Sequence, residues 1–236
     1  MSPRPRKSEQ QNLQRAILDT AWRQIAQLGA PALSLRGIAR ALNITAPAIY
    51  NYYPDRDALV TALIIEAYTS FGDAQLTARD SIPADDLEGR MEAIGNAYRR
   101  WALTYPERYQ LIFGTPIPGY VAPMEQVFPA AARALSALVS VVDALRVAGR
   151  LTAPAFPPPH PDFVSAFEKW KQFSGEYHIF SVSVAILIWA RVHGIVSLEI
   201  GGQIPPFAPD SAGLYQYEMQ SIKKQFFRAT TPSASS

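Results

Sequence analysis

The side chains able to do chemistry in this 236-residue chain are few. The chain has no cysteine, which excludes disulfides, thiolate metal sites and cysteine nucleophiles. Its three histidines, His160, His178 and His193, do not stand at metal-ligand spacings such as HExxH. The motifs GxSxG, GxGxxG and the P-loop do not occur. The sequence therefore predicts a binding protein, with no catalytic residue, no metal and no cofactor.

Charge is unevenly distributed along the chain. Residues 1–60 hold eight Lys or Arg and four Asp or Glu, whereas the rest holds fourteen basic and sixteen acidic side chains. A basic N-terminal segment on a near-neutral body is typical of a DNA-binding head, and a solvated basic face is the alternative. The basic arm at residues 1–8 contains Arg4, Arg6 and Lys7. It either enters a minor groove or is disordered.

Aromatic side chains recur at helical spacing in the middle of the chain. Tyr98, Trp101 and Tyr105 share one stripe, and Tyr109 and Phe113 follow it. Such rings either fill a core or line an apolar cavity, where the polar tips of Tyr and Trp suit a small ligand. Both alternatives stay open on the sequence.

The elements that position these residues begin with two helices. Apolar residues at spacings of three and four predict an amphipathic helix over residues 9–28, which ends at Gly29. Its expected buried positions are Leu13, Ile17, Ala21, Ile25 and Leu28. A short second helix is capped by Ser34. Its expected buried positions are Leu35, Ile38, Ala39 and Leu42.

A tight turn follows the second helix. We expect Asn43 in the left-handed conformation, Ile44 buried, and Thr45 capping a third helix that ends before Pro54. Asp55 is expected to cap a longer fourth helix. Two short helices separated by a three-residue turn are typical of a helix-turn-helix unit.

The remainder of the chain predicts only helices, so the expected fold class is all-α. The expected spans are residues 87–105, 107–113, 125–149, 177–200 and 211–228, with a further helix through Phe163, Phe167 and Trp170. The proline-rich run 151–161 predicts a rigid extended loop. Apolar stretches such as residues 182–190 are too short to span a bilayer, so we expect a cytoplasmic protein with no membrane partner.

Residues 33–63, LSLRGIARALNITAPAIYNYYPDRDALVTAL, closely resemble the DNA-binding signature of the tetracycline-repressor (TetR) family. The family more often has Gly at the position of Asn43 and Phe at that of Tyr53; both residues here keep the chemistry. The resemblance implies a DNA-binding domain at residues 1–55, including the basic arm. It also implies an effector-binding and dimerisation domain at residues 56–228, and the expected disordered tail is residues 229–236.

The resemblance also indicates which side chains meet DNA. The N-terminal residues of a recognition helix face base edges, and here they are Thr45, Ala46 and Pro47. Tyr50 and Asn51 extend this surface, and an Asn side chain can bond an adenine edge twice. Tyr52 and Arg56 are similar to family positions that grip phosphates, and Arg36 aligns with a position that reaches a phosphate or a guanine. Ser34, at the start of the second helix, is a further candidate for contact with DNA. For one of the tyrosines Tyr50 and Tyr52, packing in the core is the alternative to contact with DNA.

A second resemblance lies near the C-terminus. Residues 188–200 contain Trp189, His193 and Gly194 in the pattern WxxxHG, similar to a TetR subgroup named for these three residues, and residues 100–114 also resemble it. The subgroup implies an effector site, for which Trp189 joins the aromatic stripe as a candidate. It also implies a homodimer through the last two long helices. His193 shares a helical face with Trp189, and a hydrogen-bonded packing role is expected for it.

Together these patterns predict a ligand-responsive repressor: a dimer that leaves a palindromic operator when an unidentified small molecule binds. One alternative is a DNA-binding regulator with no small-molecule effector. A helical enzyme or carrier is another, which the residue inventory disfavours.

Overall fold

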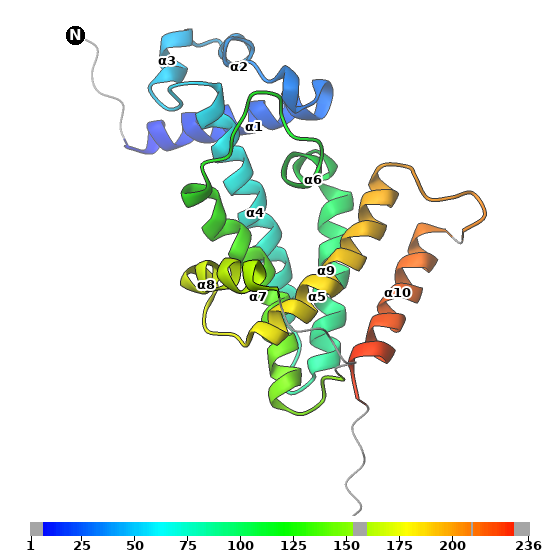
Figure 1. The fold of residues 1–236 in the computed structure, drawn as a ribbon. Helices are drawn as coiled ribbons and strands as arrows, with labels where there is room; N and C mark the ends of the chain where they lie inside the picture. The colour runs from blue at the N-terminus through cyan, green and yellow to red at the C-terminus, as the bar shows by residue number, and fades with distance from the viewer. Residues whose placement is uncertain (1–6, 153–159, 209, 229–236) are drawn as a thin grey trace, which may run out of the picture. The chain divides into compact units, whose positions relative to one another are not determined.

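The computed structural model describes residues 7–152, 160–208 and 210–228. Ten α-helices and one 3-10 turn form in these ranges, without a named strand, so the all-α prediction is confirmed (Figure 1). Most of the basic arm, most of the proline-rich run and the C-terminal tail lie outside the described residues.

The chain forms two compact units. Unit 1 comprises Met1–Tyr68 and Tyr105–Val127, and unit 2 comprises Thr69–Thr104 and Phe128–Ser236. Helix α4 (Arg56–Asp80) supplies residues to both. The functional division proposed at residue 55 stays a prediction.

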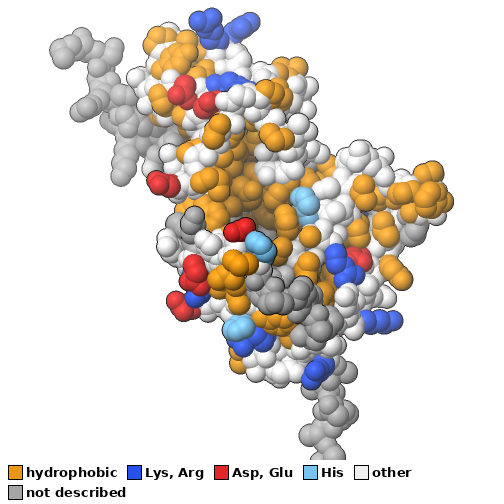
Figure 2. Space-filling model, in the orientation of Figure 1, with side chains coloured by type: hydrophobic (Ala, Val, Ile, Leu, Met, Phe, Trp, Pro, Cys, Tyr) orange, Lys and Arg blue, Asp and Glu red, His pale blue; other side chains and the backbone are white. Residues whose placement is uncertain are grey.

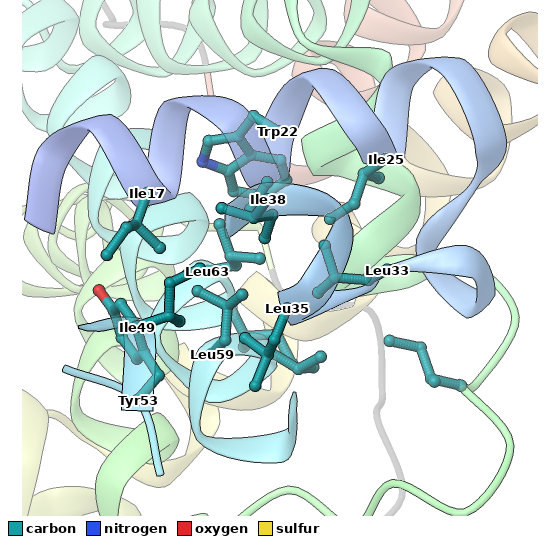
Figure 3. Packing of buried hydrophobic residues seen from close by; sticks show 14 of the residues in the cluster. Ile17, Trp22, Ile25, Leu33, Leu35, Ile38, Ile49, Tyr53, Leu59 and Leu63 are labelled. Carbon is teal, nitrogen blue, oxygen red and sulfur yellow. The ribbon is translucent and has the colours of Figure 1, made fainter. Parts of the chain in front are cut away.

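Unit 1 is built on α1 (Lys7–Leu28), the 3-10 turn η1 (Ala30–Ala32), α2 (Leu35–Ala41), α3 (Ala46–Tyr50) and α6 (Pro106–Phe113). Apolar side chains from α1, α2, α3 and α4 meet in one core, shown in Figure 3. Its largest fully buried members are Ile17, Ile38, Ile49, Leu59 and Leu63. Most of the apolar residues that define the predicted helical spacing in α1 therefore do face a core.

Four predicted core positions differ from the structure. Leu13, in the first half of α1, is half-buried against the core cluster. Leu28 is 66% exposed, because α1 ends there and the core packs one turn earlier, on Ile25. Leu42 and Ile44 are half-buried against the rim of the core, since the turn between α2 and α3 lies at the surface. Within that turn, Asn43 has a φ of 53°, which confirms the left-handed conformation.

Unit 2 contains α5 (Leu87–Thr104), most of α7 (Met124–Val147), α8 (Pro161–Ser174), α9 (Ile179–Ile200) and α10 (Ser211–Phe226). Helix α5 packs against α9 and α10. A Cβ at Gly95 would lie 2.6 Å from the Met219 methyl carbon, so glycine permits the close approach of α10 to α5. The Tyr215 hydroxyl then donates to the Gly95 carbonyl at 2.5 Å.

Ion pairs and polar contacts fix the other helices of unit 2. Arg99 of α5 binds both carboxylate oxygens of Glu199 at the end of α9 (2.8 and 2.6 Å). Asp143 of α7 accepts a hydrogen bond from the buried Ser181 hydroxyl of α9 at 2.6 Å. These contacts determine which faces of α9 point inward.

Candidate nucleic-acid interface

Helix α3 and its two cap residues expose both polar and apolar side chains outside the core of unit 1. Ile49 is fully buried, whereas Thr45, Pro47, Tyr50 and Asn51 are exposed. Ala46 is half-buried. One fully buried side chain thus anchors a five-residue helix, and the exposed side chains of the helix and its two caps are accessible to a large partner.

Thr45 stands at the N-cap position of α3 but its side chain forms no capping hydrogen bond. The prediction that it caps this helix is therefore wrong. The reason lies in Pro47, which has no N–H to donate, while the N–H of Ala48 already bonds the Thr45 carbonyl at 3.0 Å. The Thr45 hydroxyl is left available.

Ser34 does cap α2, as predicted. Its hydroxyl accepts from the Gly37 N–H at 3.2 Å, and its own N–H donates to the Gln24 side chain of α1 at 3.1 Å. These bonds hold the start of α2 on α1. Arg36, two residues later, is exposed.

Arg56 has contacts that sequence reasoning missed. Its guanidinium donates to the backbone carbonyls of Ala30, Pro31 and Leu33 at 3.1–3.2 Å. The first residue of α4 therefore holds the η1 segment in place. Next to it, the Asp55 carboxylate caps α4 by accepting from the Ala58 N–H at 2.7 Å, which confirms that prediction.

The two adjacent tyrosines after α3 are placed differently. Tyr53 is buried in the core, and burial raises the pKa of its hydroxyl. Tyr52 is half-buried and also packs against the core cluster. Its predicted contact with phosphate stays a prediction, as do the contacts of the other DNA-facing candidates.

A second set of side-chain contacts in unit 1, centred on Arg108, was also not predicted from the sequence. The Arg108 guanidinium of α6 lies over the Trp22 ring of α1 at 4.8 Å and pairs with Glu66 of α4 at 3.2 Å. Glu66 also pairs with Arg15 of α1 at 3.3 Å. No local pattern could reveal this network, because 42 residues separate Arg108 from Glu66 and 86 separate it from Trp22. It fixes α6 to α1 and α4.

The aromatic stripe is divided between the two units. Tyr98 and Trp101 belong to unit 2, where both are buried and both contact Phe71 with ring centroids 4.9 Å apart. The residues of the stripe in unit 1 are Tyr105, Tyr109 and Phe113. Tyr109 is buried and its ring lies 5.1 Å from that of Phe113, whereas Tyr105 is exposed.

His193 joins the buried end of the stripe in unit 2. Its Nδ1 lies 2.8 Å from the Tyr98 hydroxyl, and its ring stacks on Trp189 at 4.8 Å. Burial lowers the pKa of His193, because it disfavours the charged form of the ring. The expected hydrogen-bonded packing role is thus what the geometry shows.

Two other properties of the molecule bear on function. Among the described residues, no group of His, Asp and Glu side chains could hold a metal ion. Helices α7 and α9 are long and apolar enough to cross a membrane by length and composition alone. The prediction that the apolar stretches are too short to span a bilayer is therefore wrong for these two helices, although core helices of globular proteins meet the same criterion.

Comparison with known families matches both ends of this architecture. Residues 17–63 match the family described as bacterial regulatory proteins, tetR family. Residues 91–222 match the family described as tetracyclin repressor-like, C-terminal domain, and this range includes the WxxxHG pattern.

Individual proteins agree with the family matches. The HTH-type transcriptional regulator Rv1816 of Mycobacterium tuberculosis is 37% identical over 203 residues, which cover 84% of this chain and 85% of that protein. The crystal structure of the regulatory protein SCO4313 covers 93% of this chain and 98% of its own, with 34% identity and a TM-score of 0.74. A protein of unknown function from Rhodococcus sp. RHA1, 22% identical with a TM-score of 0.69, shares the fold. The chain therefore belongs to the TetR family, whose members are DNA-binding transcriptional regulators and not enzymes.

Proposed function

We propose that this regulator is a cytoplasmic homodimeric repressor, which binds a palindromic operator and leaves it when a small apolar or aromatic ligand binds. The observation that carries the DNA-reading part is the exposed face of α3, held by a single buried anchor, Ile49. In a helix-turn-helix this helix lies in the major groove.

The chemistry of that face suits base edges. Asn51 supplies an amide that can form two hydrogen bonds with adenine. The Thr45 hydroxyl, which makes no capping hydrogen bond, can donate or accept a hydrogen bond. Pro47 offers an apolar surface for a thymine methyl group. These three side chains are the proposed sequence readers.

The exposed face of α9 is the observation that favours the proposed dimer. Leu187 and Leu198 are large, apolar and exposed, and Ala190 and Gly194 between them are exposed as well. These four positions follow helical spacing and form one stripe, and a Cβ at Gly194 would meet only open space. Since a stripe of this kind is unfavourable in water, a second copy of α9 is its proposed cover.

Helix α10 and the preceding turn extend this apolar surface. Tyr217 of α10 and Phe207 of the turn are both strongly exposed. Figure 2 shows hydrophobic side chains gathered over the turn between α9 and α10, at the right edge of the view. A two-fold dimer through these helices presents two identical heads, which is why the operator is expected to be palindromic.

The proposed effector site is the aromatic cluster of unit 2. There Tyr98, His193 and Ser197 place polar atoms among aromatic rings, with the Ser197 hydroxyl 3.4 Å from His193 Nε2. An apolar ligand with one hydrogen-bonding group fits such a mixture.

A regulator without a small-molecule effector is the second candidate. It is favoured by the burial of Tyr98, Trp101 and Tyr109, whose rings contact neighbouring rings within their own units, as core residues do.

One experiment separates the two. Genomic fragments bound by the purified chain are selected and footprinted, and small compounds are then screened for release of the complex. A two-fold symmetric footprint and a compound that releases it support the first proposal. A symmetric footprint that aromatic and apolar compounds leave intact, with no shift in melting temperature, favours the second.

A further inference from the structure

The helix-turn-helix carries only two charged side chains. Residues 34–54 contain Arg36 and Arg40 and no other Lys, Arg, Asp or Glu. Both arginines lie on α2 and both are exposed. Within the described part of the chain, neither side chain forms a hydrogen bond or an ion pair.

The other described arginines of unit 1 are all engaged by the fold. Arg15 pairs with Asp19 at 2.6 Å, and Arg23 donates to the Thr20 hydroxyl at 2.8 Å. Arg56 binds three carbonyls and Arg108 binds Glu66, as described above. Among the arginines of unit 1 whose side chains the structure describes, Arg36 and Arg40 are therefore the two whose N–H donors remain available to another molecule.

The geometry of α2 directs both side chains the same way. They are four residues apart and share one helical face, whereas Leu35, Ile38 and Ala39 face the core. Like charges at this spacing repel and destabilise an isolated helix. An anionic partner that contacts both guanidinium groups offsets this repulsion with two favourable contacts. Figure 2 shows Lys and Arg side chains at the surface at the α2 end of unit 1.

We propose that Arg36 and Arg40 grip neighbouring phosphates of one DNA strand, with Arg40 as a contact that neither the sequence motif nor the family match assigns. The inference rests on the DNA binding proposed for α3. Phosphate is the expected target because the first helix of a helix-turn-helix crosses the DNA backbone while the second reads bases. The bonds that Ser34 makes to Gly37 and Gln24 hold α2 in position for this contact.

The test needs no operator, because a phosphate contact is independent of sequence. Binding of wild type and Arg40→Gln to a short mixed-sequence duplex is measured by fluorescence anisotropy between about 50 and 200 mM salt. Loss of one phosphate contact lowers the slope of log affinity against log salt by about 0.9 for each head on the DNA. At 0.1 M salt the affinity falls about eightfold per head.

Two further variants make the result specific. Arg133→Gln removes the same charge from unit 2, where Arg133 pairs with Asp73, and is expected to keep the wild-type slope. Arg40→Lys keeps a cation at this position and is expected to retain most of the wild-type salt slope. Melting curves check that each variant is folded.

Each remaining outcome is decisive. A wild-type slope for a folded Arg40→Gln variant overturns the phosphate contact. A loss confined to the selected operator, with mixed-sequence DNA unaffected, also overturns it and makes Arg40 a base reader. Failure of the wild type to bind any duplex contradicts the DNA-binding proposal itself, and is therefore distinguishable from failure of this inference.

Discussion

Helices α3 and α9 both expose a face, but the chemistry of the two faces differs. The exposed residues of α3 and its caps include the Thr45 hydroxyl and the Asn51 amide beside Pro47 and Tyr50, whereas α9 exposes a stripe that includes Leu187 and Leu198. A face with polar groups can remain in water until DNA arrives. An apolar stripe is less favourable in water, so the comparison sets a transient interface with DNA against the permanent dimer interface proposed for α9.

The largest expected effect comes from placing a charge in the apolar stripe. Leu198→Asp should give a monomer by light scattering, because the carboxylate would be buried unpaired against the second copy. Operator affinity should fall at least about 100-fold, since two linked heads bind far more tightly than one.

Val164→Asp is the matched control for this prediction. Val164 and Leu198 are both 38% exposed, but Val164 belongs to α8 and not to the stripe on α9. We expect this variant to stay dimeric. A Leu198→Asp variant that stays dimeric would show that the α9 stripe is not part of the dimer interface. The contrast between α3 and α9 would then no longer hold.

The next effect tests the reading face of α3. Asn51→Ala should weaken operator binding by about 1–3 kcal/mol if the amide bonds a base twice, with a smaller effect on mixed-sequence DNA. Titrations on operator and scrambled duplexes measure the difference. Equal losses on both would show that Asn51 does not read sequence.

Arg56→Ala should destabilise the head. Removal of the guanidinium leaves the carbonyls of Ala30, Pro31 and Leu33 without their charged donor. We expect the free energy of unfolding to fall by about 1–3 kcal/mol, measured by urea denaturation. An unchanged free energy together with a smaller salt slope on DNA would instead favour the phosphate role that the sequence suggested.

Arg56 also shows where sequence reasoning stops. The helices of the head could be predicted because their signals are local: apolar spacing, Gly29, Asn43 and the cap Asp55. The carbonyls that Arg56 binds lie 23–26 residues earlier in the chain. A pairing at this distance depends on tertiary packing, which no local pattern encodes. For the same reason the sequence could place the aromatic stripe on helices but could not find the ring contacts around Phe71.

Ser34 and Thr45 offer a matched pair at the two N-caps of the helix-turn-helix. Ser34→Ala should lower the free energy of unfolding by about 1 kcal/mol, because the capping bond to Gly37 is lost. Thr45→Ala should leave stability within about 0.5 kcal/mol of wild type, since its hydroxyl caps nothing, yet weaken operator binding. Urea denaturation and operator titration of both variants measure this. A stability loss in Thr45→Ala equal to that in Ser34→Ala would contradict the assignment of a free hydroxyl to α3.

The smallest expected effect concerns the inner face of α9, opposite in role to its apolar stripe. Burial holds the pKa of His193 below its ordinary value of about 6.5. The unfolded chain therefore takes up a proton at a higher pH than the folded one. The stability attributable to a neutral His193 is fully present above about pH 6.5 and declines as the pH falls towards the folded pKa, by about 1.4 kcal/mol for each unit of pKa difference.

His193→Gln should flatten this dependence, because an amide can keep a hydrogen bond to the Tyr98 hydroxyl but does not titrate in this range. Urea denaturation of both proteins at about pH 7.5 and pH 5.5 gives the two differences. A smaller acid loss in the variant is expected. Equal losses would mean that the His193 ring becomes charged without leaving its place beside Tyr98 and Trp189, and that the inner face of α9 tolerates a charge which its outer stripe is predicted to reject.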